Sequence, residues 1–115
     1  MTTPEPPTPD EQHGGDALTL PAALVGHGSL FALTMYGDSM IDAAICHGDI
    51  VVVRRQSTAE NGDLVAATVD GEPTVRMYRV RRGRRELVPR NPAYDATPAD
   101  DAELLGKIVS VIRRI

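Results

Sequence analysis

Short apolar segments separated by turn residues constrain this chain more than any other sequence feature. The segments are rich in Val, Ile and Leu, and Gly48-Asp49 and Asp70-Gly71 each mark a turn beside one of them. Asp-Gly suits the positive φ angles of a tight hairpin. The pattern predicts a mostly β domain with strands over residues 30–36, 50–53, 64–69, 74–80, 85–88 and 107–115.

The first 17 residues differ in composition from the rest. They hold four prolines, four of the chain's 16 acidic residues and no Lys or Arg. Such a stretch buries too little apolar surface to offset its ordering entropy, so we expect a mobile tail over 1–17 and one domain over 18–115. The tail carries the whole net charge of −4. The balanced remainder gives no general attraction to nucleic acid.

Several classes of protein fit the composition poorly. No apolar run approaches the roughly 20 residues of a membrane span, and the N-terminus does not have the pattern of a secretory signal. The single cysteine, Cys46, excludes an internal disulfide and suits a reducing compartment. His13, His27 and Cys46 lack the spacing of metal ligands. We therefore expect a cytoplasmic protein with no metal, no cofactor and no membrane contact.

A Gly-Asp-Ser-Met turn, Gly37 to Met40, follows the first expected strand. A small turn between a strand and a helical segment exposes a serine hydroxyl and directs the following backbone amides toward whatever that hydroxyl attacks. A short helix is expected from Met40 to Ile45. The simpler interpretation is that Ser39 caps this helix, with Asp42 completing a capping-box-like pattern.

The serine segment resembles that of the LexA repressor and UmuD family. Further matches occur in the same order as in that family. They are Asp-Ala-Ala-Ile at 42–45, Gly-Asp at 48–49, Asn-Gly-Asp-Leu-Val at 61–65, Asp-Gly-Glu at 70–72, Thr-Val at 74–75, Pro89, Asn-Pro-Ala-Tyr at 91–94 and Gly-Lys-Ile-Val at 106–109. The resemblance covers about residue 20 to the end. It implies a partly barrel-shaped β fold like that of LexA and signal peptidase, with short helical turns.

The resemblance also implies a reaction. In the family a serine, here Ser39, attacks a peptide bond of its own chain when the RecA filament stimulates it. A neutral lysine is the general base, and by resemblance the Met40 amide belongs to the oxyanion hole. This chain has Arg76 where the family has lysine, after Thr74-Val75 and 37 residues beyond Ser39. A guanidinium keeps its proton and has no acceptor lone pair, so Arg76 cannot deprotonate the serine.

This departure favours a catalytically impaired domain, and other interpretations stay open. The rival is an active serine endopeptidase that cleaves a LexA-type substrate in trans, with water or His47 as the base. One interpretation of Arg76 is an ordinary structural or ion-paired strand residue, and the other is an electrostatic element of a weakened site. An arginine installed to hold such a domain uncleaved would give the same sequence. The only lysine, Lys107, does not match the family's base.

Two further departures concern substrate and partners. The sequence contains no Ala-Gly or Cys-Gly bond, at which the family cuts itself. Only 38 residues precede Ser39, so we expect no direct binding of operator DNA. By resemblance we expect a homodimer, or a heterodimer with a relative, formed through the segment from Lys107 to Ile115. The RecA filament and a translesion polymerase are further expected partners in an SOS-type response to DNA damage.

An arginine-rich hairpin is expected around Gly83. Five arginines lie between Arg79 and Arg85. They form either a charged edge that discourages sheet-to-sheet aggregation or a contact for an acidic partner or a phosphate backbone.

Overall fold

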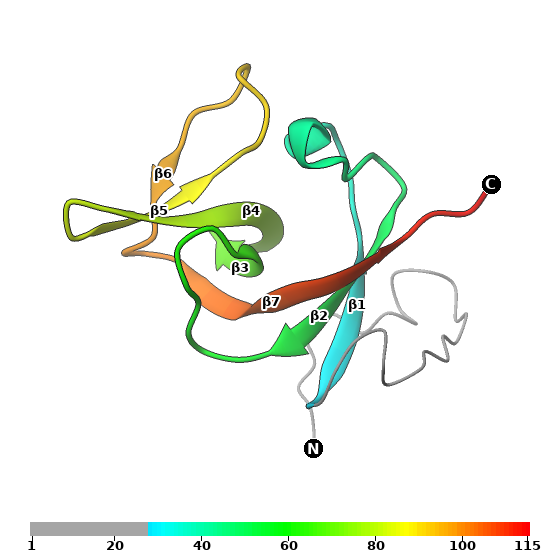
Figure 1. The fold of residues 1–115 in the computed structure, drawn as a ribbon, viewed down its shortest axis with the longest axis horizontal. Coiled ribbons are helices and arrows are strands. Elements are labelled where there is room, and N and C mark those ends of the chain that lie inside the picture. Colours follow the sequence, from blue (N-terminus) through cyan, green and yellow to red (C-terminus); the bar gives the residue numbers. More distant parts are fainter. Residues whose placement is uncertain (1–27) are drawn as a thin grey trace.

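A computed structural model describes residues 28–115. They form a seven-stranded antiparallel sheet that curls around its core, with one short 3-10 helix beside it (Figure 1). The predicted mostly β fold is confirmed. The predicted tail over residues 1–17 lies outside the described residues.

The order of strands in the sheet is β1-β2-β7-β3-β4-β5-β6, and every neighbouring pair is antiparallel. The last strand therefore lies inside the sheet, third in the order, and joins the β1–β2 pair to the β3–β6 portion. The elements are β1 (Leu30–Thr34), η1 (Ile41–Ala43), β2 (Ile50–Arg55), β3 (Leu64–Val69), β4 (Glu72–Arg81), β5 (Arg84–Val88), β6 (Thr97–Pro98) and β7 (Glu103–Ile112).

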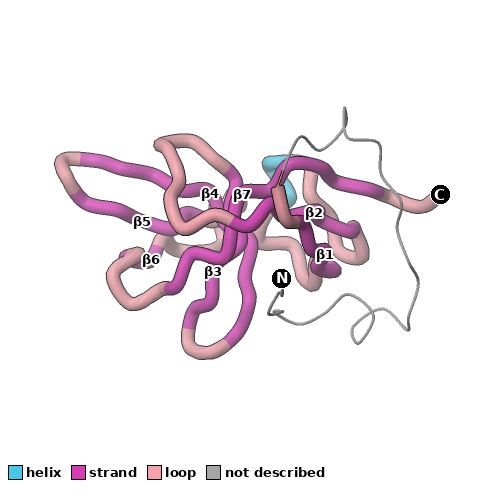
Figure 2. The backbone as a smooth tube through the Cα atoms, turned by 90° about the horizontal axis from the view of Figure 1, so that it is seen from below, coloured by secondary structure: helices cyan, strands magenta, loops and turns pink. Residues whose placement is uncertain are grey.

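Two tight hairpins shape the second half of the sheet. Asp70-Gly71 joins β3 to β4, and Arg82-Gly83 joins β4 to β5; all four residues have positive φ. Positive φ at both central residues is the signature of a type I′ turn, which matches the right-handed twist of the flanking strands. Figure 2 shows the β4–β5 hairpin projecting at the end of the molecule opposite the C-terminus.

Bulges let β7 serve both halves of the sheet. Its pairing shifts by one residue opposite Val52/Val53 of β2 and again opposite Ala66/Ala67 of β3. Such bulges bend a strand and increase its twist. Between them, Gly106 passes so close to β2 that an added Cβ would overlap the Arg54 carbonyl oxygen. The close approach requires glycine at this position.

Apolar side chains pack in two clusters. The larger cluster joins β1, β2 and the Ser39 loop, with Met40, Ile45 and Val51 fully enclosed, and the smaller cluster contains Val65 and Leu87. Burial of such side chains supplies most of the driving force for folding. The described residues include no helix long and apolar enough to cross a membrane.

The expected elements differ from the observed ones mainly at their ends. The helix after Ser39 is a single 3-10 turn of three residues, because Ala44 adopts a left-handed conformation that ends it. β4 begins two residues before the expected range, and β7 begins at Glu103. The two-residue strand β6 was not expected, since its Thr-Pro sequence carries no strand pattern.

Candidate active site

The Ser39 loop connects β1 to η1 and is held from both sides. The Met40 side chain is completely buried in the larger cluster, and its sulfur accepts a hydrogen bond from the Arg90 amide at 3.4 Å. Ser39 is itself buried, with 7% of its surface exposed. Its hydroxyl does not cap η1, so the capping interpretation is wrong.

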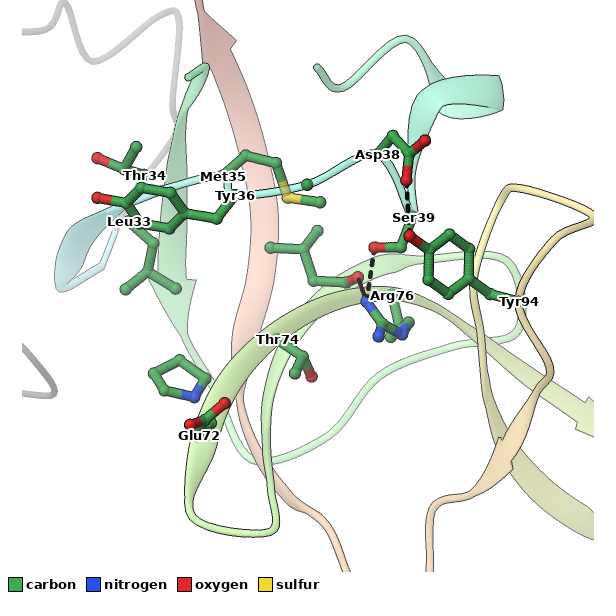
Figure 3. Close-up of a pocket in the computed structure, with 13 residues that line it drawn as sticks. Leu33, Thr34, Met35, Tyr36, Asp38, Ser39, Glu72, Thr74, Arg76 and Tyr94 are labelled. Carbon is green, nitrogen blue, oxygen red and sulfur yellow. Dashed lines mark hydrogen bonds between the residues drawn. The ribbon is translucent and has the colours of Figure 1, made fainter. Parts of the chain in front are cut away.

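The Ser39 hydroxyl instead meets Arg76, from the middle of β4. Arg76 Nη1 donates a hydrogen bond of 3.0 Å to Ser39 Oγ and one of 2.7 Å to the Val75 carbonyl oxygen (Figure 3). The fold therefore brings together the two residues, 37 positions apart, that the resemblance pairs. The arginine donates where a general base would have to accept.

Arg76 is a half-buried cation without an ion-pair partner among residues 28–115, so the ion-paired interpretation finds no support. Burial lowers the pKa of its guanidinium, since desolvation disfavours the charged form, and the nearby Tyr94 hydroxyl opposes that effect. The arginine still carries its charge at neutral pH. The site thus holds a permanent positive charge beside the serine.

The serine and arginine line an open cavity of about 530 Å³. One wall consists of the end of β1 and the residues after it, and the opposite wall is the first half of β4. Leu33, Met35, Pro73 and Val75 give the cavity apolar surface. Its dimensions suit a short peptide segment rather than a single small ion.

A clamp from the segment after β5 fixes the Ser39 loop. Tyr94 Oη donates to Asp38 Oδ1 at 2.7 Å, and Asn91 Nδ2 donates to the Asp38 carbonyl oxygen at 2.8 Å. The bond to the Asp38 carboxylate, with its charge, raises the pKa of Tyr94. The Asn-Pro-Ala-Tyr segment at 91–94 was one of the motifs that match the family. Its distance from Ser39 along the sequence did not indicate that it holds the serine loop.

His47 and Lys107 are occupied elsewhere. His47 Nδ1 accepts the Gly37 amide at 2.9 Å, and its ring lies edge-on to Tyr36. Lys107 forms a 3.5 Å ion pair with Asp63. Within residues 28–115, neither side chain has a recorded hydrogen bond to Ser39. In the part of the chain that the structure describes, neither His47 nor Lys107 is therefore placed to take the proton of this hydroxyl.

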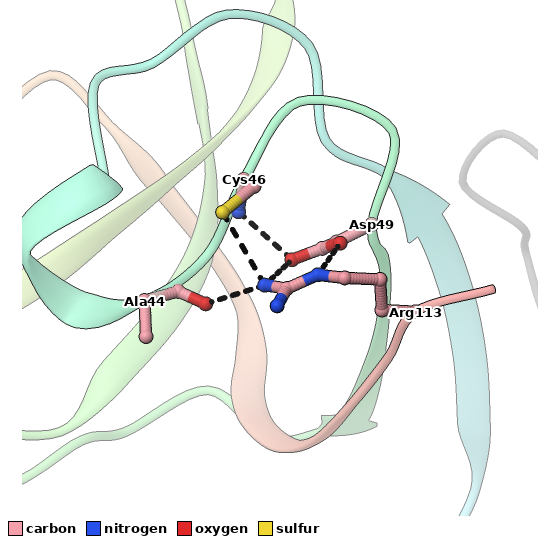
Figure 4. Close-up of polar contacts among 4 residues, drawn as sticks. All are labelled: Ala44, Cys46, Asp49 and Arg113. Atoms are coloured by element: carbon pink, nitrogen blue, oxygen red, sulfur yellow. Dashed lines mark hydrogen bonds and ion pairs between the residues drawn. The ribbon is translucent and has the colours of Figure 1, made fainter. Parts of the chain in front are cut away.

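Asp49 is a buried carboxylate that forms an ionic contact with the half-exposed Arg113, which the sequence did not reveal. Its carboxylate accepts two 2.8 Å hydrogen bonds from Arg113, through Nε and Nη2, and a third from the Cys46 amide (Figure 4). Asp49 was expected to be a turn residue, and the bond to Cys46 is of that kind. The Arg113 contact ties the end of the chain to the loop between η1 and β2, and its hydrogen bonds lower the pKa of Asp49.

Asp49→Asn should lower the free energy of unfolding by about 2 kcal/mol at pH 7, because charge-assisted hydrogen bonds to a buried carboxylate are lost. The folded-state pKa of Asp49 is depressed, so its contribution is present above the unfolded value near 3.9 and disappears as the pH falls through the folded pKa. Urea unfolding from pH 7 to pH 3 measures this. The two proteins should converge at low pH, and a constant difference would contradict the assignment.

The arginine hairpin forms as expected around Gly83. Arg79 pairs with Glu86 across the hairpin at 2.7 Å, and the hydrogen bonds from Arg79 lower the pKa of Glu86. Arg81, Arg82 and Arg84 line a shallow depression at the tip. None of these residues lines the cavity at Ser39.

Comparison with known proteins gives consistent matches. The family model Peptidase S24-like matches residues 4–109. LexA repressor 1 of Nocardia farcinica is 59% identical over 105 residues, covering 91% of this chain and 49% of the relative. The LexA repressor of Mycolicibacterium smegmatis is 58% identical over 100 residues, which cover 87% of this chain and 41% of the relative. The LexA repressor of Bifidobacterium adolescentis is 53% identical over 109 residues, which cover 95% of this chain and 42% of the relative.

The chain spans less than half the length of these relatives. Because the relatives are named repressors, the expectation that operator DNA is not bound has no support from the comparison. The assignment of the chain to a family rests on the extent of these matches, together with the antiparallel β fold and the Ser39–Arg76 pair. The chain belongs to the Peptidase S24-like family and resembles the C-terminal domain of LexA repressors.

Proposed function

We propose that this domain is a LexA-type peptidase fold that does not cleave and that acts as a dimeric interaction module in a bacterial response to DNA damage. The observation that supports this proposal most strongly is the hydrogen bond from Arg76 Nη1 to Ser39 Oγ. A serine hydroxyl becomes an effective nucleophile when a base removes its proton. Arginine occupies the position of that base and donates to the oxygen instead, so the hydroxyl stays protonated.

Reaction with a fluorophosphonate probe tests this proposal. The probe forms a bond between serine oxygen and phosphorus and releases fluoride, so it reports an activated serine without requiring a peptide substrate. The native chain should remain unlabelled at Ser39 at pH 8, as should Ser39→Ala, whereas Arg76→Lys should be labelled. Mass spectrometry locates the adduct. Labelling of native Ser39 as fast as in Arg76→Lys would refute the proposal.

An unpaired strand edge supports the proposed dimer. β3 pairs with β7 only as far as Lys107, while β2 pairs with β7 through Ile112. Among residues 28–115, the stretch from Ile108 to Ile112 is thus paired along one edge and open along the other, and its end projects toward the C-terminus (Figure 1). An open edge can pair with the same segment of a second copy, and Val111 on this stretch is 38% exposed.

Val111→Asp should shift the protein from dimer toward monomer, because two like charges would face a self-complementary contact. Analytical ultracentrifugation over a concentration series measures the shift, with Val80→Asp as the control because Val80 is a similarly exposed valine in the β4–β5 hairpin. Dimerisation of Val111→Asp equal to that of the native chain would place the interface elsewhere.

The proposed partners follow from the family. They are a second copy, a full-length relative, the RecA filament and a translesion polymerase. A non-cleaving copy paired with a cleavable relative would alter that relative's response without any chemistry of its own. Pull-down with an activated RecA filament, compared between the native chain and Val111→Asp, separates a filament contact from a dimer contact.

A second candidate function is an active endopeptidase acting in trans. It is favoured by the cavity and by the backbone amide of Ser39, which donates no hydrogen bond to another residue within 28–115. The Ser39 amide is available to an oxyanion, whereas Met40, the expected oxyanion donor, is fully enclosed and does not line the cavity. This candidate requires water to take the serine proton, and it predicts cleavage by the native chain that Ser39→Ala abolishes.

A further inference from the structure

We propose that the Ser39–Arg76 cavity binds the carboxylate of an extended peptide, with a C-terminal α-carboxylate as the preferred form. This inference deepens the proposed function, because it names the ligand class that a non-cleaving site would take. Three features of the described residues support it: the unpaired charge of Arg76, the unused donors around it, and the shape of the cavity.

Arg76 forms no ion pair with any acidic side chain of residues 28–115. Its recorded hydrogen bonds use Nη1 alone, so Nε and Nη2 have no recorded acceptor among residues 28–115. Arginine in proteins binds carboxylates through two parallel N–H donors, a geometry that these free nitrogens can supply. A half-buried guanidinium loses hydration, and a bound carboxylate compensates for that loss.

The surroundings of Arg76 add donors for the same anion. Among residues 28–115 the Ser39 amide has no acceptor, and the Ser39 hydroxyl has its own proton to donate while its oxygen accepts from Arg76. A planar carboxylate at this point would meet hydrogen-bond donors on several sides. Converging donors of this kind recognise an anion more tightly than a single surface arginine does.

The remaining charges of the cavity fix the orientation of the ligand. The Asp38 carboxylate is bonded to Tyr94 Oη. Glu72 lies on the same wall as Arg76 but four residues earlier along β4, roughly 13 Å away at the spacing of a strand. Figure 3 shows Ser39, Arg76 and Tyr94 gathered on one side of the cavity, with the Asp38 carboxylate held beside them by Tyr94, and Glu72 apart from them. The ligand carboxylate therefore belongs at the Arg76 end.

The rest of the cavity suits the peptide that precedes this carboxylate. β4 pairs with β5 only from Met77 onward, so within the described part of the chain its first half, from Glu72 to Arg76, has an open edge. This half lines the cavity opposite Leu33 and Met35. An extended peptide can add to such an edge while its apolar side chains enter the cavity.

Fluorescence anisotropy with the peptide Leu-Val-Ala-Ala, labelled at its N-terminus, tests the proposal. The free acid should bind the native chain at least about tenfold more tightly than the C-terminal amide, as expected for a charge-assisted bidentate contact. Arg76→Gln should remove this difference, and Arg81→Gln, a matched loss of charge on the β4–β5 hairpin, should retain it. Equal affinities of acid and amide for the native chain would overturn the proposal.

Two additions keep the result unambiguous. The amide-capped peptide Leu-Val-Ala-Asp carries only a side-chain carboxylate; weaker binding than the free acid supports a preference for C-termini, and equal binding refutes that preference. If Arg76→Gln does not fold, as circular dichroism would reveal, Arg76→Lys replaces it and should retain a reduced preference for the acid. An undiminished preference in Arg76→Lys would argue against bidentate binding.

The outcome is separable from that of the proposed function. The peptide lacks an Ala-Gly bond, and its mass is checked after each titration. If the native chain binds acid and amide equally and does not cleave an Ala-Gly peptide, the carboxylate site is refuted and the proposal of a non-cleaving domain is not. Cleavage of an Ala-Gly peptide by the native chain would refute the proposed function even where the acid preference persists.

Discussion

Arg76→Lys should give this domain a measurable peptidase activity, about 10² to 10⁴ times that of the native chain, which is the usual contribution of a general base. The native cavity already supplies the setting that a lysine base needs. Arg76 is half-buried, forms no ion pair with a carboxylate among residues 28–115, and its Nη1 lies 3.0 Å from Ser39 Oγ. The same desolvation would lower the pKa of a lysine amine and leave part of it neutral.

The pH dependence identifies the base. A lysine acts only after losing its proton, so cleavage by Arg76→Lys should increase from pH 7 to pH 10, as the pH passes through the pKa of the amine. The lysine amine ends about one bond nearer the backbone than Nη1, and the Val75 carbonyl, now 2.7 Å from Nη1, can orient it. An Arg76→Lys/Ser39→Ala double variant should be inactive. An Arg76→Lys variant that folds but does not cleave would show that the site has decayed beyond one residue.

Gly106→Ala should lower the free energy of unfolding by about 3 kcal/mol, which is at the upper end of the range for an overpacked core. The new Cβ would overlap the Arg54 carbonyl oxygen and lie 2.8 Å from Val53 Cγ1. Neither group can move easily, because the β2 backbone is bonded to both β1 and β7. Urea unfolding monitored by circular dichroism measures the change.

Ser110→Thr is the matched control for this prediction. It adds one methyl group to the same strand at a half-exposed position and should change stability by no more than about 0.5 kcal/mol. A Gly106→Ala protein as stable as the control would mean that β7 and β2 separate there at little cost, which contradicts the close approach.

The parts of the fold that the sequence predicted are those with local signals. Asp70-Gly71 marked the β3–β4 turn because positive φ at both residues favours that dipeptide. Gly83 marked the next hairpin, and β-branched runs marked the strands. The pairing of Ser39 with Arg76 was predicted because their 37-residue spacing matches a known family pattern. Those two residues do lie in contact.

Contacts between segments far apart in the sequence could not be predicted in this way. Tyr94 clamps Asp38 across 56 positions and Arg113 binds Asp49 across 64, and neither pair has a periodic or turn-forming pattern. β7 pairs with both β2 and β3 through bulges that shift its register. The sequence of β7 alone does not indicate where these bulges lie. The free donors of Arg76 became apparent only from the packing around the side chain.

Incubation of the native chain with a LexA-type peptide containing Ala-Gly, followed by mass spectrometry from pH 7 to pH 10, tests the central claim most directly. With Arg76 in the position of the base, the peptide should remain intact at every pH, as it should with Ser39→Ala. Cleavage by the native chain that disappears in Ser39→Ala would contradict a non-cleaving site and require a different proton acceptor for Ser39.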